Sequence, residues 1–221
     1  MSDLLELVKK AALKVDVENS SRKRNKGQSW LRFGRYNLMF KRFEYITNNE
    51  PHASIREGLR VVFEVVDHSP FRGYNATEEV RAIVEETEHE PGTEVVRTYN
   101  IAKASVAKFG LEPLIKEMSA LFSALWQAGP VTVDEKAFKW FDDQVESEKL
   151  DPDADFNHDV QQWFFTQTKK DQESLSSAFE GTVIGLDLVP GRDREGEIKT
   201  FPVKATGETA VDKRHFWLVR S

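Results

Sequence analysis

Residues 30–46 read WLRFGRYNLMFKRFEYI, a stretch in which aromatic and basic residues are interleaved. Alternate residues from Tyr36 to Phe40 are apolar, which predicts a strand with one buried face, because side chains alternate between the two faces. Further along, Phe43 and Tyr45 have the opposite parity, so a bulge or bend is expected in a long first strand. This stretch indicates that β-structure organises the domain.

Two more strands and a helix follow this stretch. Residues 59–66 alternate with one well-buried face, and residues 93–101 form a third strand after the Pro91-Gly92 turn. The apolar residues between 114 and 125 then recur at helical spacing. Pro113 suits the first turn of that helix, and a Gly-Pro pair ends it.

An acidic helical segment comes next, at residues 129–181. It holds thirteen Asp and Glu against five Lys and Arg, which is 5 − 13 = −8. Thr132 and Glu135 predict a capping box at the start of one helix, and a further helix is expected over 160–179. Strands resume at 182–189, 198–204 and 216–219.

This order predicts an α+β fold, a five-stranded OB-like barrel with a helix between strands 3 and 4. We divide the chain into four parts. Residues 1–28 are an N-terminal amphipathic helix and a basic linker, and 29–128 are the first part of the barrel with its helix. Residues 129–181 are the acidic helical insertion, and 182–221 supply the closing strands.

The composition narrows the class of protein. The 221 residues include no cysteine, which excludes disulfides, thiolate nucleophiles and cysteine-ligated metals and is typical of a reducing compartment. The N-terminus has no basic region followed by an apolar one, and no apolar run approaches the ~20 residues of a membrane span. We therefore expect a cytoplasmic protein with no membrane partner.

Catalytic and cofactor motifs are missing from the sequence, so we expect no enzyme activity, no cofactor and no metal. There is no phosphate-binding loop, no HExxH and no GxSxG, and the five histidines lack metal-ligand spacing. The loop beginning at Asp151 resembles the start of an EF-hand. However, Phe156 stands where the turn needs glycine, and Gln162 where calcium needs glutamate.

The net charge of −6 is unevenly distributed. Between Ser20 and Tyr45 there are eight Lys and Arg against one Glu, which is 8 − 1 = +7. Such a separation favours an anionic partner, because contacts with phosphates dominate affinity for nucleic acids. The alternative is a solvated basic loop followed by an ordinary strand.

Several segments together resemble a family of small phage-encoded single-stranded-DNA-binding proteins with an OB-type barrel. The matching segments are Gly34–Leu38, Arg60–Val66, Pro91-Gly92 with Val95–Ile101, Ile115–Leu125, and Gly181–Val189 with Glu197–Val203. The chain departs from the family in its long acidic insertion. It also ends in KRHFWLVRS rather than in the acidic tail that many such proteins use to recruit partners.

The resemblance implies non-sequence-specific binding of single-stranded DNA in bacteriophage DNA replication or recombination, in the host cytoplasm. Binders of this kind combine a basic groove with aromatic rings on which bases stack. The candidate nucleic-acid-binding residues are Arg22, Lys23, Arg24, Lys26, Trp30, Arg32, Arg35, Lys41, Phe43, Tyr45, Phe71, Arg72 and Tyr74. We expect Phe43 and Tyr45, with Lys41, on the exposed face of the first strand. Phe71 and Tyr74 either stack on bases or cover the end of the barrel.

Two other functions remain open. The acidic insertion is the candidate site for replication or recombination proteins, and a protein-interaction or inhibitor module would use it without binding DNA. An assembly protein would form homo-oligomers through the helix at 3–15 and through the aromatic run Trp163-Phe164-Phe165. Three consecutive aromatics on one helix are not expected all to face inward, so one is predicted to meet a neighbouring molecule.

Overall fold

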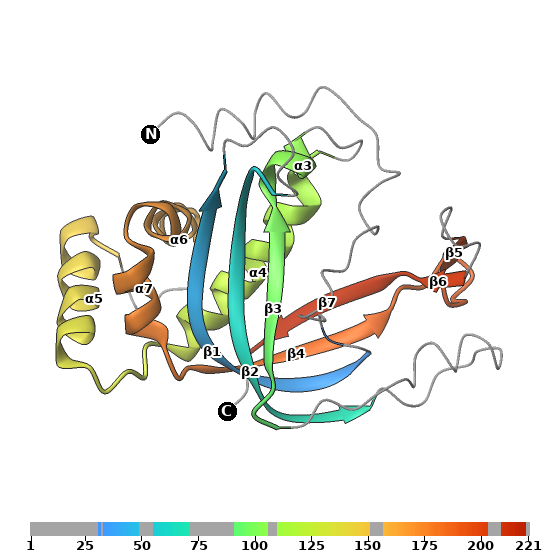
Figure 1. Ribbon diagram of the computed structural model, residues 1–221, viewed down its shortest axis with the longest axis horizontal. Helices are drawn as coiled ribbons and strands as arrows, with labels where there is room; N and C mark the ends of the chain where they lie inside the picture. Colours follow the sequence, from blue (N-terminus) through green and yellow to red (C-terminus); the bar gives the residue numbers. More distant parts are fainter. Residues whose placement is uncertain are drawn as a thin grey trace.

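The computed structural model describes residues 31, 33–48, 55–70, 91–105, 110–150, 157–202 and 209–219. These residues form an α+β fold, with a five-stranded antiparallel sheet, a small two-stranded sheet and five helices (Figure 1). Among the described helices, none is both long enough and apolar enough to cross a membrane.

The five-stranded sheet has the order β3-β2-β1-β4-β7. Its strands are β1 (Gly34–Thr47), β2 (Glu57–Pro70), β3 (Glu94–Asn100), β4 (Val183–Pro190) and β7 (Lys213–Leu218). The first three strands are therefore consecutive neighbours, and β4 returns to the free side of β1. Strands β5 (Thr200–Pro202) and β6 (Thr209–Val211) form a separate hairpin between β4 and β7.

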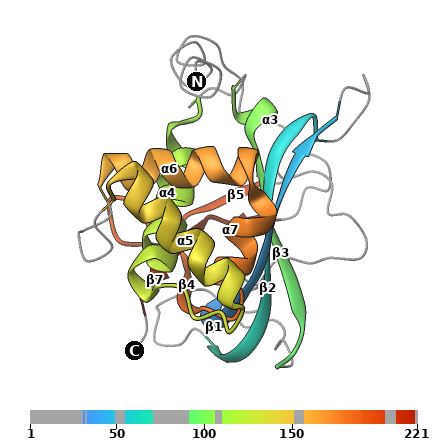
Figure 2. The same ribbon diagram turned by 90° about the vertical axis from the view of Figure 1, so that its left-hand side faces the viewer.

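The helices within the described residues lie between β3 and β4 in the chain. They are α3 (Ile101–Ser105), α4 (Glu112–Ala128), α5 (Glu135–Glu148), α6 (His158–Lys170) and α7 (Gln172–Phe179). Figure 2 shows α4, α5, α6 and α7 grouped on one side of strands β1, β2 and β3.

Strands β1 and β2 bend sharply, so that their two halves run in different directions (Figure 1). Their pairing shifts register between Asn37 and Leu38 and again between Phe40 and Arg42. Each shift marks a bulge, which increases the local bend and twist of the strands. The first half of β1 consequently pairs with β4, whereas the second half turns away from β4 toward the helices.

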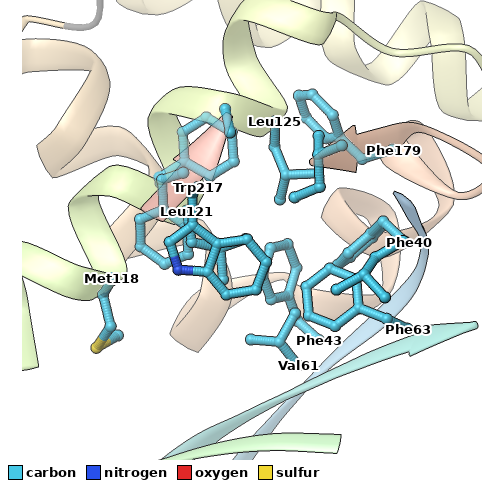
Figure 3. Close-up of a cluster of buried hydrophobic side chains, with 14 of the residues drawn as sticks. Phe40, Phe43, Val61, Phe63, Met118, Leu121, Leu125, Phe179 and Trp217 are labelled. Carbon is cyan, nitrogen blue, oxygen red and sulfur yellow. The ribbon is translucent and has the colours of Figure 1, made fainter. Parts of the chain in front are cut away.

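One hydrophobic cluster joins the sheet to the helices. Its residues come from every strand of the large sheet and from α4, α5, α6 and α7, and Figure 3 labels Phe40, Phe43, Val61, Phe63, Met118, Leu121, Leu125, Phe179 and Trp217. On β2, the predicted apolar face of Leu59, Val61, Phe63 and Val65 is fully buried. The acidic helices are thus part of the same core as the sheet.

Helix α7 covers the edge of β1 that β4 leaves unpaired. The backbone N–H of Phe43 donates to the Ser176 hydroxyl at 2.9 Å, and that of Tyr45 donates to the Gln172 side chain. Just beyond the helix, the backbone carbonyl of Thr182 accepts from the N–H of Phe40 at 2.8 Å. Polar side chains of the helix therefore satisfy backbone donors that a neighbouring strand would otherwise bind.

Three predictions about the fold need correction. The sheet is open, since β3 and β7 are its two end strands and do not pair, so the expected closed barrel is wrong. The strand expected at 198–204 contributes β5 to the side hairpin and not to the large sheet. The helix expected at 160–179 is two helices, because Asp171 leaves the helical conformation and its carboxylate caps α7 at Ser174.

The aromatic run on α6 also differs from the prediction. Trp163 and Phe164 are buried, and half-buried Phe165 packs edge-on against Phe122 with 5.1 Å between ring centroids. The helix lies between α4 and α7 and so has a wide buried arc, wide enough for all three rings to contact the protein's own core.

Candidate nucleic-acid interface

Four of the thirteen predicted nucleic-acid-binding residues lie within the described residues, all on β1. These four are Arg35, Lys41, Phe43 and Tyr45. The other nine, Arg22, Lys23, Arg24, Lys26, Trp30, Arg32, Phe71, Arg72 and Tyr74, lie outside them. So do the amphipathic helix expected at 3–15 and the EF-hand-like residues 151–156.

The prediction that Phe43 and Tyr45 face solvent is wrong. Phe43 is only 3% exposed, and its ring meets Phe40 and Phe122 in the core. Tyr45 pairs with buried Leu59, so it lies on the core face too. The reason is the bulge at Lys41, because one extra residue in a strand turns every later side chain to the other face.

Tyr45 is half-buried and fully engaged in polar contacts. Its hydroxyl donates to the Glu57 carboxylate, and the Lys169 ammonium lies 5.6 Å from its ring centroid. Burial and the Glu57 carboxylate raise the pKa of Tyr45 well above its usual range. These contacts link β1, β2 and α6, and the Tyr45 side chain packs against the core cluster.

Lys41 remains on the outer face of the sheet, where its charge is balanced. It lies 3.7 Å from Glu64 and 3.8 Å from Glu180. Its neighbour Arg42 lies 2.9 Å from Glu44 and 3.5 Å from Glu94. The outer face of β1, β2 and β3 is therefore a mixed-charge surface rather than a basic groove.

A different surface of the sheet carries an exposed aromatic ring. On β7, His215 and Trp217 face the core, so Phe216 faces outward and is 51% exposed. Arg214 and Leu218 share this outer face because side chains alternate along a strand. We call the surface formed by Arg35, Val183, Arg214, Phe216 and Leu218 the Phe216 face.

Cross-strand register joins Arg35 to this surface. Phe216 pairs with Asp187 on β4, which in turn pairs with Arg35 on β1. Directly paired residues have side chains on the same face, and the Arg35 and Asp187 side chains are 3.6 Å apart. At about 4.8 Å between strands, Arg35 lies roughly 10 Å from Phe216 across the sheet. The exposed ring thus has Asp187 directly beside it on β4 and Arg35 beyond that carboxylate on β1. Arg214 lies two residues away on the same strand as the ring, 3.6 Å from Asp212.

Sequence reasoning missed Phe216 and Arg214. Alternation along KRHFWL places an aromatic residue on each face of the strand, and this was the available signal. It does not reveal which face is exposed. That depends on α4, which packs against β7 on the side of Trp217.

Behind the Phe216 face lies a buried polar cluster centred on Glu117 of α4. The Arg97 guanidinium on β3 donates two hydrogen bonds to this carboxylate, at 2.9 and 2.7 Å. The Tyr99 hydroxyl donates at 3.3 Å, and Nδ1 of His215 on β7 lies 3.7 Å away. Glu117 therefore reaches both end strands of the open sheet.

Electrostatics keep His215 neutral at neutral pH. Burial and the positive charges of Arg97 and Lys213 lower the pKa of His215 to about 4, against the opposing effect of Glu117. The cluster then holds one carboxylate and one guanidinium in bidentate contact, a geometry that stabilises buried charge.

Metal binding finds no support in the part of the chain that the structure describes, where no group of three or more acidic or histidine side chains is placed to hold an ion. Comparison with protein-family models, with characterised proteins and with solved structures gives no match. The geometry of the sheet and its surfaces therefore carries the functional argument.

Proposed function

We propose that this protein binds single-stranded DNA without sequence preference, through the Phe216 face of its sheet. The observation that carries the proposal is the exposed ring of Phe216, which shares one face of the sheet with Arg214 on its own strand and Arg35 two strands away. An aromatic ring can stack on any base, because every base has a flat face, and arginines can bind the phosphates. Such a surface therefore binds single strands without sequence specificity.

The connectivity of the sheet supports the same proposal. Its order β3-β2-β1-β4-β7, with helices between the third and fourth strands, is compatible with an opened barrel of the proposed OB type. The bent first strand fits that architecture as well. With the resemblance of its segments, this favours a role in bacteriophage DNA replication or recombination, where single strands are exposed.

The exposed ring of Phe216, and not the charge, distinguishes the Phe216 face from the outer face of β1, β2 and β3. On both surfaces the basic side chains lie beside carboxylates: Lys41, Arg42 and Arg60 lie beside Glu64 and Glu44, Arg35 is 3.6 Å from Asp187, and Arg214 is 3.6 Å from Asp212. The basic residues at 22–26 add positive charge from the sequence, and we propose that they contact phosphates.

The test is fluorescence anisotropy with a labelled oligo-dT of about 30 nucleotides and the matching duplex, at two salt concentrations. Phe216→Ala should weaken binding to the single strand about 5- to 160-fold, because a stacked base contributes roughly 1–3 kcal/mol. Phe138→Ala removes an equally exposed ring, 43% exposed on α5, and should leave affinity unchanged.

A second pair of variants tests the phosphate contacts. Arg214→Gln should reduce the slope of log affinity against log salt by about 1, whereas Arg194→Gln in the exposed loop after β4 should not. No binding of the single strand at low salt would rule out the proposal.

A second candidate function is assembly or protein interaction through the acidic helices. Val131, Val133 and Phe138 are 52%, 99% and 43% exposed beside the acidic residues of α5. If the protein assembles through this surface, sedimentation velocity should detect concentration-dependent homo-oligomers that Phe138→Asp abolishes. A protein that stays monomeric at all concentrations argues against assembly.

A further inference from the structure

The end strands of the sheet are connected by one side chain of a helix. β3 and β7 do not pair with each other, yet Arg97 on β3 and His215 on β7 both meet the carboxylate of Glu117 on α4. A barrel would join such strands by a ladder of backbone hydrogen bonds. Here the carboxylate spans the opening between them, with two hydrogen bonds from Arg97 on one side and a 3.7 Å contact with neutral His215 on the other. We call this arrangement the bridge.

The same strand carries the bridge on one face and the proposed DNA contact on the other. His215 and Phe216 are consecutive residues of β7, so the first faces Glu117 and the second faces outward. Next to them, the Trp217 ring stacks on Phe63 of β2 with 5.5 Å between centroids. The position of β7, and therefore of the Phe216 ring, depends on what its core face contacts.

The bridge resists rearrangement because its charges are largely buried. The side chains of Arg97, Glu117 and His215 are 23%, 18% and 9% exposed. Moving the carboxylate away would leave the buried guanidinium of Arg97 without its counter-charge, which is strongly unfavourable. The Glu117 carboxylate is therefore held firmly to Arg97 on β3, and it packs against the neutral His215 of β7 from that fixed position.

We propose that Glu117 is a positioning residue for DNA binding, which holds β7 against β3 and so fixes the Phe216 face in the geometry that a base can stack on. This inference rests on the proposed function, and it adds a residue that would never touch the DNA. The inference predicts that substitutions of Glu117 and Phe216 have non-additive effects on the free energy of DNA binding.

The experiment is a double-mutant cycle measured with the labelled oligo-dT. Glu117→Gln should weaken binding at least about threefold, the scale of coupling through a shared backbone shift. In the Phe216→Ala background the same substitution should change affinity little. Glu112→Gln is the matched control, because Glu112 lies on the same helix in an exposed ion pair with Lys116 and should have no effect in either background.

A purely structural role would give a different pattern. Glu117→Gln would then lower thermal stability and leave affinity unchanged, or it would weaken binding equally in both backgrounds, and either result overturns the inference. If Glu117→Gln does not fold, the cycle uses the double variant Arg97→Gln/Glu117→Gln, which removes both buried charges together.

Hydrogen exchange of the free protein separates this inference from the proposed function. Glu117→Gln should speed exchange of the β7 amides relative to Glu112→Gln, and unchanged exchange overturns the bridge itself. If Phe216→Ala leaves affinity unchanged while β7 exchange does respond to Glu117→Gln, the bridge is supported and the proposed DNA-binding face fails.

Discussion

The rings of Phe40 and Phe43 lie 4.6 Å apart between centroids on the core face of β1, although residues three apart in a regular strand face opposite ways. The register shift between Phe40 and Arg42 explains this, since the strand accommodates one extra residue there. The bulge therefore converts an aromatic that the sequence pattern places outside into a core residue.

Replacing Phe43 by Ala should accordingly lower stability and not act as a binding-site mutation. We expect a loss of about 3–5 kcal/mol in the free energy of unfolding, as for other buried Phe residues. Urea denaturation measures this loss. Phe216→Ala is the comparison, because its ring is half exposed and should cost much less stability. Equal losses for both variants would contradict the burial of Phe43.

Ser176→Ala tests whether α7 stabilises the edge of β1 that β4 leaves unpaired. The substitution leaves the buried N–H of Phe43 without the hydroxyl that accepts its hydrogen bond, which costs about 1–3 kcal/mol. Hydrogen exchange of the Phe43 amide should become faster, whereas Ser177→Ala on the same helix should not change it. An unaffected Phe43 amide would show that the hydroxyl is dispensable.

The N-cap of α5 is Asp134 and not Thr132. A capping box was predicted from Thr132 and Glu135, but the N-cap is Asp134, whose carboxylate accepts from the N–H groups of Lys136 and Ala137. Asp134→Ala should therefore cost about 1 kcal/mol, or roughly 2–4 °C in melting temperature. Thr132→Ala should lower the melting temperature less than Asp134→Ala does. If calorimetry shows the larger loss for Thr132→Ala, the predicted capping box is correct after all.

His215 should make the protein less stable in acid. Its pKa of about 4 in the folded protein lies below the value near 6.5 of an unfolded chain. Between these values the unfolded state binds the proton, so stability is fully present above about pH 6.5 and is lost as the pH falls toward 4. The loss from this residue is up to about 3 kcal/mol.

Urea midpoints at about pH 7 and about pH 4.5 measure that loss. His215→Gln should reduce the difference between the two midpoints, and His158→Gln, at the exposed start of α6, should not. Identical pH dependence in wild type and His215→Gln would mean that the histidine is not held neutral by burial.

Much of the secondary structure follows from local patterns. The alternation around Val61 predicted β2, the helical spacing after Pro113 predicted α4, and the change of parity in β1 predicted its bulge. These features depend on neighbours within a few residues, and a periodicity of two or 3.6 records them directly. The place of the helices between the third and fourth strands was equally readable.

The candidate site was much less predictable. Whether Phe43 or Phe216 faces solvent depends on how the bulge propagates and on which face of β7 meets α4. The basic side chain of Lys41 looked free in the sequence, but Glu180 from the far end of the helical segment neutralises it. Partners that distant leave no periodic signal.

The sequence by itself determined most of the described elements, their order and the segregation of charge, because short-range sterics and hydrophobic spacing decide these locally. Only the tertiary structure decided that the sheet stays open, that Glu117 meets both Arg97 and His215, and that Phe216 remains exposed. Those outcomes depend on contacts between residues far apart in the chain, and packing of the whole core selects among them.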